Sequence, residues 1–477
     1  MSTETSAGKK PAGEASKVSR RKFIYAAGAV AVVALAGGGY YFYTLPKPKK
    51  YLRYMGHPFW LPEDGAQAFR DANPDINLET TYLDFYVVPQ REYADPSAWD
   101  VCGSGRSGPL VKSNLVKPIP IDMIPRWGLD KALAPFNKAD QYYGPEMAKR
   151  FNGLLWEGGK AGGNLVAVPN MTGYESQNYL PEFLPYSEKG DEVSMSYEEL
   201  WNPEWKGHVG VIDEGFDNFA RLANYLDYTK QMTFSGAFTN ATHDELDKIF
   251  NFILPIVKTG QFTTFWTKYG DISSLMSTRD VWLSVSWVPV SLDCRKAGVP
   301  AFHAAIKEGP CFWYNVSMIS NQGNPDVFNE AVRLCNFHLE PFIQAAYAKQ
   351  LYTSATPYWD DLKNTMGSEF YEWFHNGAPT YEPIDQITKE QWPDDQTKWT
   401  LPEGMQQGLF QPDAYFKSFW TGGASRTGSP DPRGNRRDLG SLKFRDSTTR
   451  WFLSPDLPDD NDYYVTKWEE LKANLPH

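Results

Sequence analysis

The sequence contains few cysteines and histidines and none of the common catalytic motifs. The 4 Cys among 477 residues are scattered and form no C-x-x-C pair, and the 7 His show no metal-ligand spacing. No G-x-S-x-G, H-E-x-x-H or P-loop sequence is present. We therefore expect no enzymatic activity, no metal and no cofactor. The thiols are expected to be free and buried, with one structural disulfide as the alternative in an exported protein.

Positive charge is scarce outside the N-terminus. Residues 1–50 contain nine Lys or Arg and two acids, so 38 basic and 56 acidic residues remain from Tyr51 onward, a net charge of −18. Such an acidic body argues against nucleic acid as a partner. Aromatic residues, by contrast, make up 15% of the chain, which is unusually high. This aromatic surface must be buried or must bind something.

The first 50 residues have the pattern of a targeting signal followed by a linker. Residues 19–24 read S-R-R-K-F-I, which resembles the twin-arginine export signal, and the apolar residues 23–36 end in a small-x-small cleavage site. This pattern predicts export through the twin-arginine machinery to the periplasm or another extracytoplasmic location. The alternative is a retained membrane anchor, because residues 23–45 are long enough to span a bilayer.

Helix-like and strand-like segments alternate along the rest of the chain. The patterns predict helices at residues 62–72, 218–228 and 242–257 and after Pro325, and strands at 76–82, 100–102, 165–169, 208–212 and 281–288. This order indicates an α/β protein with parallel or mixed sheets. From Asp360 the composition shifts to Pro, Gly, Asp, Trp and charged residues, and this tail receives no assignment.

Two stretches carry motifs that composition alone does not explain. Residues 196–209 read S-Y-E-E-L-W-N-P-E-W-K-G-H-V. The second stretch contains Trp287, K-A-G-V-P at 296–300, Phe312-Trp313 and Thr356-Pro357. The first resembles the W-x-D-L-W-x-P-x-[YW]-K-G-x segment of the spermidine/putrescine-type extracellular solute-binding proteins of ABC importers, and the second follows that family's order. The resemblance covers residues 51–358, and about 360–460 have no counterpart.

The resemblance implies a two-lobed, periplasmic-binding-protein-like α/β fold with a ligand cleft that closes by hinge motion. Crossings between the lobes would fall near Gly173, Asn315 and Tyr358. After the signal or anchor and linker at 1–50, the expected lobes are 51–173 with 315–358, and 174–314 with 359–477. The implied function is that of an exported, monomeric, non-enzymatic protein that hands a small solute to an ABC permease in the membrane.

The resemblance also implies which aromatic residues bind the solute. Trp287 and Trp313 fall where the family places aromatic walls around an alkylamine, burying its methylenes and facing its ammonium groups. Trp60, next to Phe59 after the first strand, lies where the family also presents aromatics. The alternative for each residue is core packing, because the chain contains 17 Trp.

Charged and polar positions give conflicting indications about the solute. Glu214 and Asp217 match two acids that pair with amines in the family, although Asp217 could instead cap the helix that follows. Asn315 stands where polyamine binders carry an acid. Arg106, between Ser104 and Ser107, suits a carboxylate, phosphate or phosphonate. We therefore expect a small cationic or zwitterionic, polyamine-like solute.

Two alternative functions remain open at this point. The first is a solute-binding protein for small anions such as phosphonates or carboxylates, which Arg106 would favour. The second is an exported carbohydrate-binding protein or hydrolase, because tryptophan platforms also stack on sugar rings.

Overall fold

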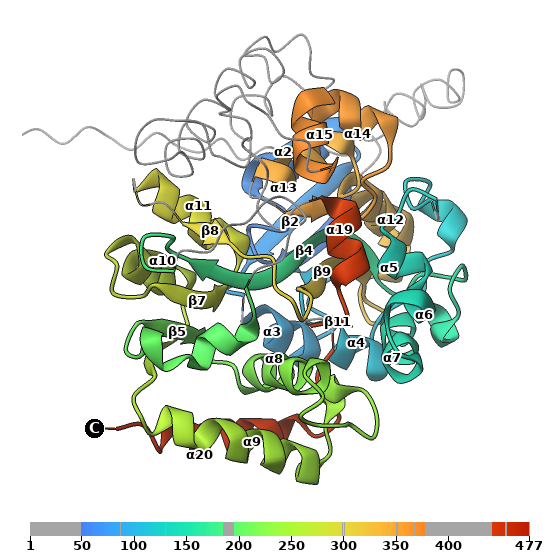
Figure 1. The fold of residues 1–477 in the computed structure, drawn as a ribbon. Coiled ribbons are helices and arrows are strands. Elements are labelled where there is room, and N and C mark those ends of the chain that lie inside the picture. The colour runs from blue at the N-terminus through green and yellow to red at the C-terminus, as the bar shows by residue number, and fades with distance from the viewer. Residues whose placement is uncertain are drawn as a thin grey trace, which may run out of the picture. The chain divides into compact units, whose positions relative to one another are not determined.

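A computed structural model describes residues 49–476 with the exception of 86, 129, 185–194, 298, 300, 350–351, 367, 377–440 and 454–455 (Figure 1). The expected export signal and the alternative anchor at 23–45 lie outside the described residues, as does most of the tail at about 360–460. Among the helices described, none combines the length and the apolar character needed to cross a membrane.

The described strands form one sheet of eleven, whose main path runs in the order β2-β1-β3-β9-β4-β7-β5-β6. The strands are β1 (Lys50–Gly56), β2 (Ile76–Tyr82), β3 (Val101–Ser104), β4 (Val168–Tyr179), β5 (Val209–Ile212), β6 (Phe262–Trp266), β7 (Leu283–Ser286), β8 (Phe302–His303), β9 (Cys311–Ile319), β10 (Thr353–Ser354) and β11 (Trp451–Phe452). β1 pairs in parallel with β2 and β3, and β5 pairs in parallel with β6 and β7. We call these two groups the first and the second half-sheet.

Two long antiparallel strands, β4 and β9, join the half-sheets. β4 pairs with β9 through residues 168–175 and with β7 through residues 176–179, so β4 itself passes from one half-sheet to the other (Figure 1). Every residue of β4 and β9 is buried. Most polar side chains on β4 find a partner there, as where Asn178 Nδ2 donates to Ser286 Oγ at 2.7 Å. Such bonds avoid the cost of unpaired buried polar groups.

Helices follow most strands, as expected for an α/β chain. They are α2 (Glu63–Ala72), α3 (Val87–Ala94), α4 (Gly108–Lys112), α5 (Ala134–Asn137), α6 (Ala139–Tyr142), α7 (Pro145–Leu155), α8 (Gly215–Tyr228), α9 (His243–Val257), α10 (Tyr269–Ser277), α11 (Val288–Lys296), α12 (Phe328–Phe337), α13 (Pro341–Lys349), α14 (Asp360–Met366), α15 (Ser368–Asn376), α19 (Leu442–Thr448) and α20 (Asn461–Lys472). Local sequence sets several boundaries. At α9, for example, Thr242 and Glu245 form a capping box that satisfies two backbone N–H groups.

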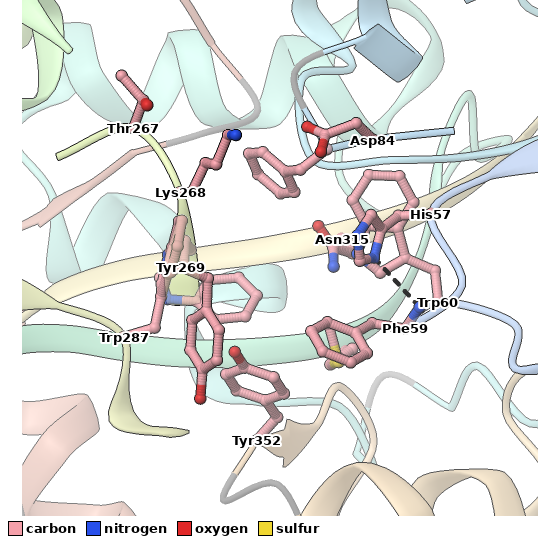
Figure 2. Close-up of a pocket in the computed structure, with 13 residues that line it drawn as sticks. His57, Phe59, Trp60, Asp84, Thr267, Lys268, Tyr269, Trp287, Asn315 and Tyr352 are labelled. Carbon is pink, nitrogen blue, oxygen red and sulfur yellow. Dashed lines mark hydrogen bonds between the residues drawn. The ribbon is translucent and has the colours of Figure 1, made fainter. Parts of the chain in front are cut away.

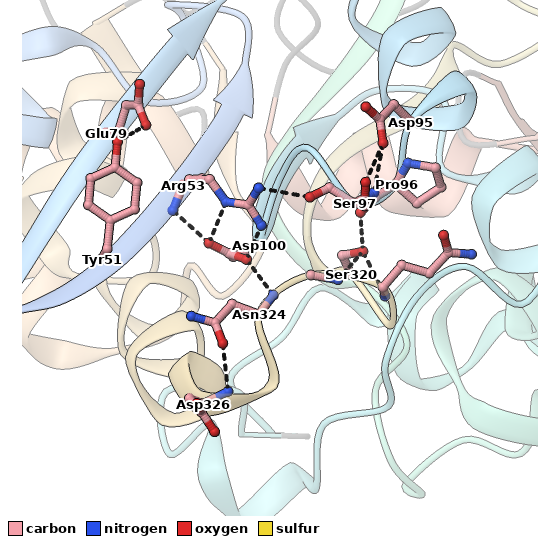
Figure 3. Close-up of polar contacts among 12 residues, drawn as sticks. Tyr51, Arg53, Glu79, Asp95, Pro96, Ser97, Asp100, Ser320, Asn324 and Asp326 are labelled. Atoms are coloured by element: carbon pink, nitrogen blue, oxygen red, sulfur yellow. Dashed lines mark hydrogen bonds and ion pairs between the residues drawn. The ribbon is translucent and has the colours of Figure 1, made fainter.

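Asp100, just before β3, fixes three segments to one another (Figure 3). Its carboxylate accepts hydrogen bonds from the Arg53 guanidinium on β1, at 2.7 and 3.1 Å, and from the Arg53 backbone N–H at 2.9 Å. The same carboxylate accepts the backbone N–H of Asn324, which precedes α12, at 2.8 Å. This buried acid therefore holds the start of β3 against β1 and against the segment that follows β9.

The C-terminal residues pack on elements from distant parts of the chain. α20 lies against α8 and α9, at the bottom of Figure 1. The approach to α8 is close, because a Cβ added to Gly215 would lie 2.6 Å from Trp468 Cβ. Asp456 binds Arg150 of α7 at 2.7 Å, and β11 pairs in parallel with β9. α14 packs on α13.

The structure confirms most of the elements expected from sequence patterns. The helices at 62–72, 218–228 and 242–257 correspond to α2, α8 and α9, and the strand at 76–82 is β2. The strand expected at 165–169 begins instead at Val168 and continues to Tyr179. The expected range is too short because buried polar residues interrupt the apolar pattern of the strand. All four cysteines are buried and free, as expected.

Candidate functional site

Loops after the carboxyl ends of parallel strands meet around one cavity of about 480 Å³ (Figure 2). From the first half-sheet, the loop after β1 supplies His57, Phe59 and Trp60, and the loop after β2 supplies Asp84 and Phe85. From the second, the segment after β6 supplies Thr267, Lys268 and Tyr269, and Trp287 follows β7. This is where α/β sheets place their ligands, because loops and helix starts converge at that edge.

The two central strands provide the base of the pocket. Met171 of β4 and Trp313 and Asn315 of β9 line it, and alternation along each strand places these side chains on one face. The Trp313 indole lies directly over Gly173, where an added Cβ would be 2.3 Å from Trp313 Cζ2. Only glycine at this position leaves room for the ring. Tyr352 meets Trp313 edge-on, with centroids 5.1 Å apart.

Aromatic rings from the two half-sheets meet across the pocket. Trp287 lies 5.9 Å from Phe85 between ring centroids, and Phe85 lies 5.7 Å from Trp60. Trp287 is also supported from its own side by Trp266 at 5.4 Å and by Tyr269 at 6.3 Å. Figure 2 shows Trp287 and Tyr269 facing Phe59, Trp60 and His57. A solute between these rings would contact both halves of the molecule at once.

Few charged groups line the pocket. Asp84 and Lys268 are both exposed and lie at the same edge in Figure 2. Burial lowers the pKa of His57, which keeps its imidazole neutral at neutral pH. Asn315 is buried at the base and offers an amide. The lining therefore combines a ring-rich interior with one acid and one base at the rim.

A second group of side chains forms what we call the ionic cluster: Arg106, Glu175, Glu214, Asp217 and Arg221. Arg106 Nη2 contacts Glu214 Oε1 at 3.1 Å and Asp217 Oδ1 at 3.3 Å. Arg221 Nη2 contacts Glu175 Oε2 at 2.6 Å, and both of these side chains are buried. Burial raises the pKa of Glu175 and of Glu214, against the opposing effect of Arg221 and Arg106 respectively.

The ionic cluster adjoins the pocket but does not line it. Glu175 continues the strand face that carries Met171 and Gly173. Gly105, the neighbour of Arg106, lies against the pocket, because an added Cβ would be 2.9 Å from Asn315 Oδ1 and 3.4 Å from Phe85 Cζ. Burial, and after it the charge of Glu175, raises the pKa of Tyr352 in the pocket lining, so the cluster acts on the pocket electrostatically.

The structure brings the expected site residues together in two groups. Trp60, Trp287, Trp313 and Asn315 line the pocket. The remaining expected residues, Arg106, Glu214 and Asp217, pair with one another in the ionic cluster. The alternative role of Asp217 as a helix cap is not seen, because no side chain makes a capping hydrogen bond at the start of α8.

The sequence patterns did not single out several pocket residues: His57, Asp84, Phe85, Met171, Thr267, Lys268, Tyr269 and Tyr352. Asp84 and Phe85 follow a strand that was predicted correctly, so their position was the available signal. Within the described part of the chain, no cluster of three or more His, Cys, Asp or Glu could hold a metal ion.

Comparison with known proteins finds similarity in structure only. No family model and no curated protein matches the sequence. The TpPotD lipoprotein of Treponema pallidum superposes with a TM-score of 0.50 at 11% identity, covering 88% of this chain and 99% of that chain. The spermidine/putrescine ABC transporter substrate-binding protein PotD of Streptococcus pneumoniae gives 0.49 at 13% identity, covering 77% and 100%. The apo ferric ion-binding protein A of Pasteurella haemolytica gives 0.45 at 15% identity, covering 64% and 85%.

At such low identities the likeness shows the fold alone. The chain has the two-lobed α/β fold of the periplasmic binding proteins, as the sequence motifs indicated. β4 and β9 connect the two half-sheets. The pocket lies where loops from both half-sheets meet.

Proposed function

We propose that the protein is the solute-binding component of an ABC importer and captures a small cationic or zwitterionic solute between its lobes. One observation carries the proposal: aromatic side chains of both lobes converge on a single pocket at the carboxyl ends of the parallel strands. A pocket built from both lobes is complete only when they are close together. Binding is then coupled to closure, which a membrane permease can recognise.

Closure would take place about the two connecting strands, near Gly173 and Asn315. These strands are buried along their whole length, so the lobes would move as rigid bodies while a few backbone torsions change. A solute that contacts Trp287 in one lobe and Phe85 in the other has higher affinity for the closed form. The solute therefore shifts the population toward closure by that difference in affinity.

Different lining residues would contact different parts of the solute. Trp60, Trp287 and Trp313 would enclose the apolar part of the solute and face a cationic group with their rings. Asn315 would donate or accept a hydrogen bond at the base of the pocket. The role is one of binding and release, with no chemical change in the solute.

Arg106, Glu214 and Asp217 would stabilise the closed state of the same site. Arg106 follows β3 of the first lobe, and the two acids begin α8 of the second. Their ion pairs would add to the stability of the closed form. Export through the twin-arginine machinery, predicted from residues 19–24, would deliver the protein to the compartment in which such solutes are captured.

The test is to purify the protein from its native source and identify retained small molecules by mass spectrometry. The identified solute is then titrated against wild-type protein and against Trp287→Leu. We expect a loss of about 1–3 kcal/mol of binding free energy in the variant, because aromatic burial is removed.

Trp282→Phe is the matched control, because Trp282 stacks on His208 at 3.5 Å and does not line the pocket. It should bind like wild type. A solute that binds with equal affinity to the folded Trp287→Leu variant would argue against this pocket as the binding site, and catalytic turnover of the solute would argue against a transport role.

A further inference from the structure

We propose that residues 441–453, which we call the brace, span the hinge of the solute site and hold it in the closed arrangement. The inference rests on the proposed function, in which the protein closes about β4 and β9 near Gly173 and Asn315. It names a device that sets the open and closed populations of that site. It also assigns a role to part of the C-terminal tail, for which the sequence patterns gave no assignment.

The brace is bound to β9 through backbone hydrogen bonds. It comprises α19, β11 and the residues between them, and β11 pairs in parallel with the start of β9. The Leu453 N–H donates to the Phe312 carbonyl at 2.9 Å, and Thr449 Oγ1 donates to the Pro310 carbonyl at 2.9 Å. These positions of β9 lie beside the part of β4 that follows Gly173 and continues to β7. The brace is therefore attached on the side of the second half-sheet.

Two side-chain contacts strengthen this attachment. The Tyr174 hydroxyl of β4 donates to the Asp446 carboxylate of α19, and both side chains are buried. Burial raises the pKa of Asp446 to about 6, so the acceptor is ionised at neutral pH and the hydrogen bond is charge-assisted. Arg450 Nη2 contacts Asp227 Oδ2 of α8 at 2.6 Å, and α8 follows β5 of the second half-sheet.

Arg445, which is buried in α19, reaches across the proposed hinge. Its guanidinium lies over the Tyr174 ring, with Cζ 5.2 Å from the ring centroid. The same guanidinium donates from Nη1 to Thr353 Oγ1 at 3.5 Å and from Nη2 to the Phe374 carbonyl at 3.2 Å. Thr353 belongs to β10, which pairs with residues of β4 that precede Gly173. One side chain thus contacts β4 beyond the hinge and elements on the other side of it.

The elements on that other side are linked to the first half-sheet. α19 packs on α15, α15 on α14, and α14 on α13 (Figure 1). Tyr347 of α13 donates its hydroxyl to the Trp60 carbonyl, in the loop after β1, at 2.7 Å. A rotation about the hinge would therefore move the two groups of Arg445 contacts relative to each other. Because a buried guanidinium that loses acceptors costs free energy, the brace favours the closed arrangement.

Double electron–electron resonance on the ligand-free full chain tests the inference, because it measures the separation of the half-sheets without a solute. Spin labels are placed at Asp64→Cys on α2 and Ser274→Cys on α10. Both positions are exposed, and their helices begin beside the pocket, after β1 and β6 respectively. All four native cysteines are buried, so the introduced thiols are the ones that react.

Loss of a brace contact should open the protein. We expect Arg445→Met and Tyr174→Phe each to raise the ratio of the longer-distance to the shorter-distance population roughly threefold or more. Tyr464→Phe is the matched control, because the buried Tyr464 hydroxyl of α20 accepts one hydrogen bond, from the Ala241 N–H at 2.8 Å, and does not contact the brace. It should keep the wild-type distance distribution. Urea unfolding of each variant checks that it is folded.

The outcomes separate the brace from the proposed function. A wild-type distribution in both folded variants, combined with opening in Arg106→Met, would overturn the brace and leave closure intact. Tyr174→Phe alone decides this result if Arg445→Met does not fold. An equal shift in Tyr464→Phe would also overturn the brace, because the effect would then not be specific to it. One unchanged distance in every variant, Arg106→Met included, would contradict closure itself.

Discussion

Arg106 and Glu214 are 108 residues apart in the sequence, and their side chains form an ion pair of 3.1 Å between Nη2 and Oε1. Arg106 belongs to the loop after β3 of the first half-sheet, and Glu214 lies between β5 of the second half-sheet and α8. Asp217 joins the pair at 3.3 Å from the same guanidinium nitrogen. This contact links segments that follow strands of the two half-sheets, so any separation of the half-sheets must break it.

Removal of this cation should weaken solute binding without removing a pocket residue. In Arg106→Met, Glu214 and Asp217 lose the cation that pairs with both, and their repulsion favours the open form. We expect a loss of about 1–3 kcal/mol of binding free energy in calorimetric titration. Arg279→Met is the matched control, because Arg279 pairs with Glu182, outside the ionic cluster. Equal losses in both variants would rule out a specific effect on closure.

Gly173 should tolerate no side chain. In Gly173→Ala, the new Cβ would meet Trp313 Cζ2 at 2.3 Å, so the indole must leave its position at the base of the pocket. We expect a destabilisation of about 1–3 kcal/mol in chemical unfolding, together with weaker solute binding. Gly153→Ala in α7 is the control, because nothing lies within 4 Å of its Cβ, and it should be neutral or stabilising. Unchanged solute binding in Gly173→Ala would show that binding does not depend on the position of the Trp313 indole.

The stability of the protein should fall as the pH rises toward 8. Glu92 of α3 is fully buried, and burial raises its pKa to about 8. The folded chain therefore keeps a proton that the unfolded chain releases near its ordinary pKa, so the folded state binds more protons between these values. The free energy of unfolding should decrease across this window by up to about 1.4 kcal/mol per pH unit from this group, and not below it.

Urea unfolding at several pH values between 5 and 8 measures this dependence. Glu92→Gln keeps the shape of the side chain and removes its proton, so it should flatten the profile. The exposed Glu146→Gln, on α7, should retain the wild-type slope. A Glu92→Gln profile parallel to that of wild type would contradict the assignment.

Strand and helix positions were predictable where one physical pattern dominated. β2 alternates buried and exposed residues over most of its length and was located without error, and α2 shows helical spacing after Pro62. β6 was missed because its side chains are mostly half-buried and show no clear alternation. The prediction for β4 ended too early because its buried polar residues find partners on other elements, as Asn178 does on Ser286 of β7, only in the folded sheet.

The residues of the site were predictable only where they lie within a recognisable sequence motif. Trp287, Trp313 and Asn315 were located through the order of short motifs, whereas Tyr269 and Tyr352 had no motif to separate them from the other 25 Tyr of the chain. The pairing of Arg106 with Glu214 and Asp217 depends on how the lobes meet. No local pattern in the sequence contains that information.

Closure of the lobes around a solute is the central claim, and small-angle X-ray scattering with and without the natively retained solute tests it most directly. A solute that contacts both lobes should reduce the radius of gyration at saturation, and the reduction should be smaller in Trp287→Leu at the same solute concentration. A radius of gyration that stays constant while calorimetry reports saturation would contradict the account, because the pocket would then be rigid.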